Sequence, residues 1–232
     1  MVRLIMACSI LCLLAGAAHS EAPFDGILVT PAWLSEHLRD PGIVILHVAN
    51  LREDYTRGHI PGARFLWPAW MARSTPERSF EMMPVDSLDA VLERLGVSND
   101  SRVVLCHVLG DVAAVARVYI TLDYLGMGDR TAILDGGFEA WKTEGKPVTK
   151  EIPRFEPGVF VPKVRESVLA NLDEVRASYD REHVRLVDAR SAQGFNASEG
   201  AGVFRGGHIK GAINIPFSSV TDSLTATSRP RS

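Results

Sequence analysis

The sequence predicts an α/β fold with a mostly parallel central sheet flanked by helices, followed by a partial second copy of the same domain. Short apolar runs alternate with helical patterns along the chain, which is typical of α/β domains. The run Val103–Leu105 shows no polar alternation, as expected for a strand that is covered on both faces. A six-residue frame at Gly58–Ala63 recurs at Gly207–Ala212, which indicates a repeated unit.

The composition is that of an ordinary globular protein. The 232 residues carry a formal net charge of −3, and 46% of them are hydrophobic. This length allows one large domain or two modest ones. The charge excludes the strongly basic balance typical of nucleic-acid-binding domains, so we expect no nucleic-acid partner.

Residues 1–20 are predicted to be a signal peptide. Arg3 precedes the apolar stretch Leu4–Ala18, and small residues precede a cut after Ser20. About fifteen apolar residues suit a signal peptide, whereas a membrane span needs about twenty. No later segment approaches that length. We therefore expect an exported protein, periplasmic or secreted, that has no membrane contact after signal cleavage.

Signal cleavage would leave Cys106 as the one thiol of the mature chain. Cys8 and Cys12 lie in the predicted signal peptide, so no internal disulfide is possible after cleavage. Cys106 ends a buried run and precedes a loop that leads into a helix, a place where α/β proteins often carry chemistry. It is a small buried hydrophobe, a thiol that can be reached from the loop, or a thiol that is oxidised or paired with a second chain.

Residues 21–145 are predicted to form the first domain. Helices are placed by apolar residues three and four apart and by capping residues, and strands by short apolar runs. The predicted elements, in order, are a helix capped by Thr30, the strand Ile43–Val48, the turn Tyr55–Ala63, the short apolar run Arg64–Trp67, a helix capped by Asp86 and ended by Gly96, a strand from Val103, a helix from Val112 to Gly126, the strand Thr131–Leu134, the turn Asp135–Gly137 and a short helix from Phe138.

Residues 146–166 are predicted to be a linker, because four prolines prevent regular helix there and favour extended chain. Residues 167–232 are predicted to be the partial second copy. In it Asn171 caps a helix that runs to Tyr179, and Val184–Asp188 has the composition of a strand. The frame Gly207–Ala212 follows this strand as Gly58–Ala63 follows the first one.

Four motifs point to a known family. They are Gly58-His59-Ile60-Pro61-Gly62-Ala63, Leu134-Asp135-Gly136-Gly137-Phe138-Glu139-Ala140-Trp141, Val187-Asp188-Ala189-Arg190, and Gly207-His208-Ile209-Lys210-Gly211-Ala212-Ile213-Asn214-Ile215-Pro216. With them the chain resembles the tandem-domain rhodanese family, the thiosulfate and 3-mercaptopyruvate sulfurtransferases. The resemblance implies two rhodanese-like domains that transfer sulfane sulfur through a cysteine persulfide, without a cofactor. The implied substrate is a small sulfur-containing anion.

The same resemblance implies that the sulfur-accepting cysteine is absent from this sequence. In tandem members it lies in the second domain, in a loop after the strand that follows Asn214–Pro216. The run Thr221–Ser232 has no strand pattern, so we expect the second domain to be truncated before its active-site loop. In the first domain His107 holds the loop position. Cys106 lies one residue earlier, which points its side chain into a sheet face and leaves it only a weak catalytic candidate.

The resemblance also bears on substrate binding. Asp188 and Arg190 match the family and are candidates for substrate binding, or else they form a structural pair. His47 stands where the corresponding strand of the first domain usually ends in an acid. Gly194 stands where many members place an anion-binding arginine, for which Arg190 or Arg205 could substitute.

The residues also bear on two other functions, phosphatase activity and metal binding. Rhodanese-fold phosphatases need an arginine six residues after the cysteine to clamp phosphate, and this chain has Val112 there. His47 and His107 could converge near Cys106 to bind copper or zinc. Since three ligands at irregular spacing arise by chance, we expect no metal.

His59 and His208 lie in turns and are predicted to be hydrogen-bonded structural imidazoles, and Trp141 is predicted to anchor the core.

Three hypotheses follow from the sequence. The chain is a sulfurtransferase in its own right, or a catalytically silent rhodanese domain that binds a protein partner or an anion, or the incomplete product of a longer gene. The sequence does not identify a protein partner.

Overall fold

The structure is a computed structural model that describes residues 24–75, 80–108, 111–196 and 207–221. The predicted signal peptide lies outside these residues. Within the described ranges, no helix is long and apolar enough to span a membrane.

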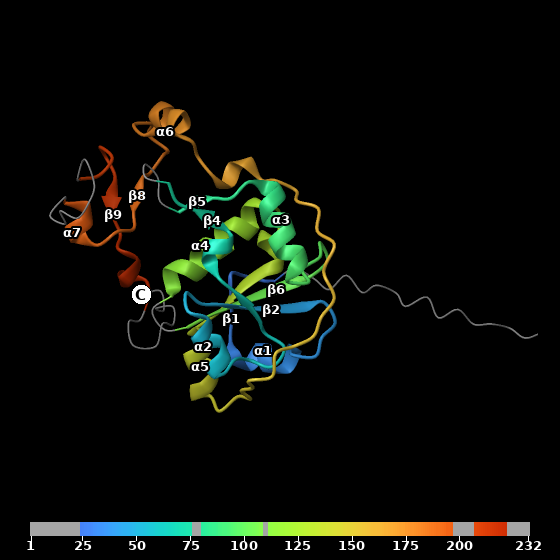
Figure 1. Ribbon diagram of the computed structural model, residues 1–232. Coiled ribbons are helices and arrows are strands. Elements are labelled where there is room, and N and C mark those ends of the chain that lie inside the picture. Colours follow the sequence, from blue (N-terminus) through green and yellow to red (C-terminus); the bar gives the residue numbers. More distant parts are fainter. Residues whose placement is uncertain (1–23, 76–79, 109–110, 197–206, 222–232) are drawn as a thin grey trace, which may run out of the picture.

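A five-stranded sheet forms the centre of the first domain (Figure 1), with the strand order β1-β7-β6-β2-β3. Each pair of neighbouring strands is parallel, which confirms the predicted fold class. The strands are β1 (Leu28–Val29), β2 (Ile43–Val48), β3 (Arg64–Leu66), β6 (Arg102–His107) and β7 (Thr131–Leu134). A separate antiparallel pair is formed by β4 (Ala72–Arg73) and β5 (Glu81–Met82).

Helices cover both faces of this sheet, so the core has two layers. Along β6 the side chains alternate: Val103 and Leu105 belong to one apolar cluster, whereas Val104 and Cys106 belong to the other. Residues of α3 and α4 complete the first cluster, and residues of α1 and α5 the second. The helices of this domain are α1 (Pro31–His37), α2 (Arg52–Arg57), α3 (Val85–Arg94), α4 (Val112–Tyr124) and α5 (Gly137–Thr143), with short 3-10 turns η1 (Pro68–Trp70) and η2 (Gly128–Arg130).

Capping residues predicted the starts of two helices of the first domain, and the structure confirms one of them. The Thr30 hydroxyl accepts a hydrogen bond from the Trp33 backbone N–H at 3.1 Å, so the predicted cap of α1 is confirmed. The prediction that Asp86 caps α3 is wrong, because the helix begins at Val85 and Pro84 holds the cap position. Asp86 instead lies in the first turn, where a negative charge is favourable.

Residues 146–165 are extended, as their prolines predict, and they lie against the first domain as a strap. The strap is attached mainly through its backbone. Gly158 N–H donates to the Glu93 carbonyl at 2.8 Å, and Val161 exchanges two hydrogen bonds with the Asn99 side chain at 2.8 Å each. Phe160 is 3% exposed and joins the core beside α3. These contacts fix the route of the strap across the domain.

Replacing Gly158 with alanine is expected to detach the middle of the strap. The added Cβ would lie 2.0 Å from the Val97 carbonyl oxygen, and a backbone atom cannot move aside cheaply. We expect a loss of about 2–4 kcal/mol of stability and faster proteolysis within residues 146–165. Gly26→Ala is the matched control, since nothing lies within 4 Å of its added Cβ. Equal protease resistance in both variants would contradict this account.

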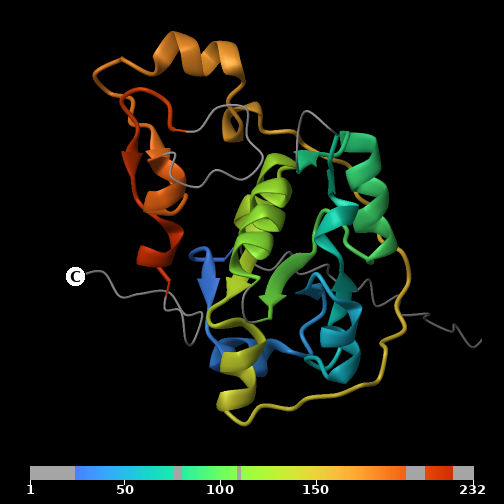
Figure 2. The ribbon, with the colours of Figure 1, turned by 60° about the vertical axis from the view of Figure 1, so that its left-hand side comes forward.

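The second copy repeats the start of the first domain. It contains η3 (Glu166–Val168), α6 (Leu172–Ser178), β8 (Val187–Asp188), α7 (Ala192–Phe195), β9 (Ile213–Asn214) and η4 (Phe217–Ser219). Asn171 caps α6 in a capping box with Glu174, as predicted. Figure 2 shows this part beside α4 and β1 of the first domain.

The strand predicted at Val184–Asp188 is shorter than expected. Only Val187–Asp188 form β8, which pairs in parallel with β9. In the first domain the equivalent strand β2 runs between two neighbours, whereas β9 is the one partner of β8 in the part of the chain that is described. No residue in 171–196 or 207–221 is buried. A strand with one short neighbour has fewer ladder hydrogen bonds to define its length.

Candidate active site

The carboxyl ends of β2, β6 and β7 meet at one edge of the sheet, where open parallel sheets place their ligands. Asp111, at the start of α4, connects two of the loops that leave this edge. Its carboxylate accepts hydrogen bonds from the Asn50 backbone N–H at 3.1 Å and the Asn50 side-chain amide at 2.8 Å. This contact joins the loop after β2 to the loop after β6, and no sequence pattern predicts it, because the two residues lie 61 positions apart. Residues 109–110 of the second loop lie outside the described part.

Cys106 does not reach this edge. Its side chain is completely buried on the α1 and α5 face of the sheet, in the cluster that contains Ile60, Phe138 and Trp141. Burial raises the pKa of its thiol far above the ordinary value, and the charge of Glu139 adds to the rise. A thiol there is neither ionised nor accessible, which are the two properties that a nucleophile needs.

His107 lies on the opposite face of β6, as the one-residue offset predicts. It is 3% exposed and packs against Gly137, and its Nδ1 lies 3.1 Å from the Val108 carbonyl oxygen. Burial lowers the pKa of its imidazole. A small, mostly apolar cavity of about 100 Å³ lies between His107, α4 and the second-copy residues Val220 and Thr221. The second copy therefore contacts the first domain at the edge where chemistry is expected.

His47 is the most unusual group near this edge. It is completely buried, and neither ring nitrogen has a hydrogen-bond partner among the described residues. Its ring packs edge-on against Tyr55 and Phe138, with ring centroids 5.5 Å apart in both pairs. Burial, followed by the charges of His59 and His107, lowers its pKa to about 4. His47 is therefore held neutral at ordinary pH.

His47 occupies the strand position that Asp188 occupies in the second copy. His47 is paired with Phe65 across β2 and β3, and Asp188 is paired with Asn214 across β8 and β9. Phe65 and Asn214 stand at the same place relative to the two repeated frames. The register thus supports the replacement of an acid by histidine that the resemblance implied.

The histidines of the two frames have equivalent structural roles. His59 stacks on Tyr55 with ring centroids 3.8 Å apart, and its Nδ1 lies 2.9 Å from the Tyr55 carbonyl oxygen. His208 stacks on Phe195 at 3.6 Å, with its Nδ1 2.9 Å from the Phe195 carbonyl oxygen. Nε2 of His59 also lies 3.1 Å from the Glu151 carbonyl oxygen, so this ring ties the strap to the domain.

Asp188 and Arg190 form the ion pair that the sequence suggested. Arg190 Nη2 lies 2.6 Å from Asp188 Oδ2, and Nε donates to both carboxylate oxygens at 3.0 and 3.1 Å. These hydrogen bonds lower the pKa of Asp188 to about 2. The same Nη2 donates to the Gly207 carbonyl at 2.7 Å. Two of the three guanidinium nitrogens of Arg190 are thus engaged within the second copy. Arg205 lies outside the described residues.

The copper or zinc hypothesis finds no support in this geometry. Cys106 and His107 point to opposite faces of β6. In the ranges that the structure describes, no group of three or more histidine, cysteine, aspartate or glutamate side chains is arranged to hold a metal ion.

The family model of the rhodanese-like domain matches this chain twice, over residues 30–144 and 171–231. The chain belongs to the rhodanese family. The sulfur carrier protein TtuD of Thermus thermophilus is 33% identical over 223 residues, which cover 89% of this chain and 73% of that protein. The thiosulfate sulfurtransferase of Rattus norvegicus is 30% identical over 206 residues, covering 82% of this chain and 69% of that enzyme. The putative thiosulfate sulfurtransferase of Synechococcus elongatus, 30% identical, is covered over 61% of its length.

Solved structures agree on the fold. The 3-mercaptopyruvate sulfurtransferase SseA of Escherichia coli superposes with a TM-score of 0.77 at 23% identity, covering 88% of this chain and 79% of SseA. YnjE superposes with a TM-score of 0.75, and the chain spans 53% of its length. These likenesses show a rhodanese fold in this chain, in agreement with the family model.

Proposed function

We propose that this chain is an exported rhodanese-family sulfurtransferase homologue whose 232 residues lack the sulfur-accepting cysteine, so that it is inactive alone. In the proposed family reaction, a cysteine thiolate attacks the outer sulfur of thiosulfate. The new S–S bond forms as the S–S bond of thiosulfate breaks, and sulfite leaves with the electron pair. Cyanide or a thiol then takes the outer sulfur and returns the thiolate.

The observation that carries this proposal is the burial of Cys106. The attacking sulfur must be ionised and must reach an anion that arrives from solvent. Cys106 is 0% exposed, and its thiol is held protonated by burial. Cys8 and Cys12 fall in the predicted signal peptide. His107 stands at the loop position of the first domain and has no sulfur to offer.

A thiocyanate assay with thiosulfate and cyanide tests the proposal on the full chain. We expect no turnover above the reagent blank, while the rat relative assayed in parallel is active. Turnover that is lost in Cys106→Ser or in the Cys8→Ser/Cys12→Ser double variant would overturn the proposal. Export is tested separately, by N-terminal sequencing of the protein recovered from an exporting host, since a mature chain should begin at Glu21.

The alternative is a catalytically silent rhodanese domain that binds an anion or a protein partner. One observation favours an anion over a protein as the bound partner. Three arginines gather around a single groove of the first domain, lined also by Tyr55, Phe65, Trp70 and Phe155.

A further inference from the structure

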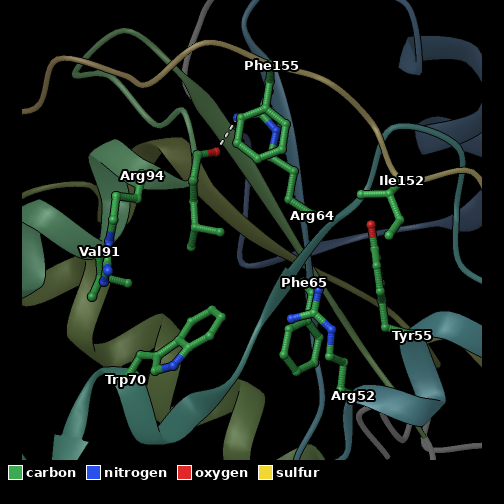
Figure 3. A pocket seen from close by; sticks show the side chains of 10 residues that line it. Arg52, Tyr55, Arg64, Phe65, Trp70, Val91, Arg94, Ile152 and Phe155 are labelled. Carbon is green, nitrogen blue, oxygen red and sulfur yellow. Dashed lines mark hydrogen bonds between the residues drawn. The ribbon is translucent and has the colours of Figure 1, made fainter.

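Three arginines line a groove on the β3 side of the first domain, where Tyr55 and Phe65 separate it from His47. A groove of about 330 Å³ is formed by α2, β3, α3 and the strap (Figure 3). It shares no lining residue with the cavity beside His107. Its volume is at the lower end of small-molecule sites, which span roughly 300–1,000 Å³. We call it the arginine groove, after Arg52, Arg64 and Arg94.

The three guanidinium groups come from separate elements and differ in their surroundings. Arg64 is half-buried, lies under the Phe155 ring at 4.1 Å and donates to the Leu95 carbonyl, while its buried Nε has no partner among the described residues. Arg52 lies over the Phe65 ring at 5.4 Å. Arg94 donates its Nε to the Ala90 carbonyl at 3.2 Å. In the described part of the chain, none of the three forms an ion pair with a carboxylate.

The packing around Arg64 depends on a glycine at position 96, which indicates that the groove is a defined feature of the fold. Gly96 has φ +70°, and a Cβ added there would collide with Arg64, with the Glu156 carbonyl and with Phe155. Glycine at this position therefore makes room for the guanidinium and for the strap above it. The strap contributes Ile152 and Phe155 to the wall. Its backbone anchors at Glu151 and Gly158 hold these side chains in place.

Aromatic rings supply the other part of the lining. Phe65 and Trp70 pack edge to face, with ring centroids 5.7 Å apart, and Trp70 remains 36% exposed. Figure 3 places Phe155 across the groove from these two rings. The Tyr55 hydroxyl donates to the Ala63 carbonyl, so it is already engaged. The free polar capacity of the groove therefore consists of guanidinium N–H donors.

Guanidinium groups bind phosphate and carboxylate through paired hydrogen bonds, and exposed aromatic faces bind planar rings. We propose that the arginine groove binds a small molecule that joins a planar heteroaromatic ring to a phosphate, of which a nucleoside monophosphate is the simplest form. The ring packs on Trp70, and the phosphate is held by Arg52 and Arg94. The proposal does not depend on sulfur transfer, so this experiment and the thiocyanate assay can fail separately.

The probe is adenosine 5′-monophosphate, titrated into the full chain by isothermal calorimetry. We expect a Kd below about 1 mM. Adenosine lacks the phosphate and ribose 5-phosphate lacks the ring, so each is expected to bind at least about tenfold more weakly. If adenosine bound as tightly as the monophosphate, the groove would recognise only the ring. If ribose 5-phosphate bound as tightly, the groove would recognise only the charge. Either result would overturn the proposal, as would no saturable binding of the monophosphate.

Matched charge variants locate the site. Arg94 is exposed, so Arg94→Gln should fold normally, and we expect about tenfold weaker binding of the monophosphate. Arg39→Gln removes the same charge from an exposed turn that follows α1, outside the groove, and should leave the Kd unchanged. Trp70→Ala should weaken the monophosphate and leave ribose 5-phosphate unaffected. If Arg94→Gln and Arg39→Gln weakened monophosphate binding equally, the effect would come from the net charge of the protein. That result would contradict the assigned site.

Discussion

Acidification from about pH 7 to about pH 4 is expected to lower the free energy of unfolding by about 3 kcal/mol through His47 alone. The folded protein holds this imidazole neutral, with its pKa lowered to about 4 from 6.5 by burial and by the nearby His59 and His107. Between these two values the unfolded chain binds a proton that the folded protein does not. The stability is therefore fully present above about pH 6.5 and is lost as the pH falls towards 4.

Urea unfolding at a series of pH values measures this effect. All four tryptophans lie between residues 33 and 141, so tryptophan fluorescence reports on the first domain. His47→Leu should be at least as stable as the natural protein near neutral pH, because two buried ring nitrogens without partners are removed. Its advantage should grow by about 3 kcal/mol on acidification. His183→Leu, at an exposed position, is the control, and parallel curves for all three proteins would refute the role of His47.

The ion pair of the second copy titrates in a different range. Arg190 holds the pKa of Asp188 at about 2, below its ordinary 3.8. Its stabilising contribution is therefore present above about pH 3.8 and is lost as the pH falls towards 2. A transition seen between pH 4 and 6.5 therefore does not come from this pair. His107, whose pKa burial also lowers, contributes in the same direction as His47, and the His47→Leu variant separates the two.

Gly137→Ala is expected to destabilise the first domain by at least about 3 kcal/mol. The added Cβ would lie 2.4 Å from the His107 carbonyl oxygen and 2.9 Å from its ring, and the residue has φ +57°. Two costs therefore combine: backbone strain, and a collision that pushes β6 and α5 apart at the edge of the sheet.

Gly145→Ala separates these two costs. Gly145 has a similar φ of +66°, but nothing lies within 4 Å of its added Cβ. This variant should lose only about 1 kcal/mol, the cost of placing a side chain in the left-handed region. The unfolding free energy of both variants is measured by urea denaturation. Equal losses would mean that the contact with His107 contributes nothing.

The sequence predicted the strands of the first domain because their signal is local. The opposite orientation of Cys106 and His107 followed from the period of a strand, and the structure confirms it. The start of α3 was missed, since Asp86 and Pro84 both suit a helix beginning and only the fold selects between them. The length of β8 was overestimated because a strand extends only as far as its neighbours allow.

The arginine groove could not be predicted, because nothing in the spacing of Arg52, Arg64 and Arg94 relates them. They meet through the packing of three elements and the strap. The strap itself was predicted as a linker from its prolines, which set its extended conformation. Its anchors on Glu93 and Asn99 lie more than 60 residues away in sequence and leave no pattern to detect.

The backbone attachment of the strap has a consequence for how this protein can vary. Val159 and Val161 point outward, 73% and 64% exposed, while their main-chain amides make the contacts with the domain. The outward side chains of this segment, unlike Gly158 and the buried Phe160, can therefore be exchanged without redirecting the chain. One wall of the arginine groove can acquire new ligand preferences by substitution at Ile152 or Phe155, while the scaffold that positions it stays unaltered.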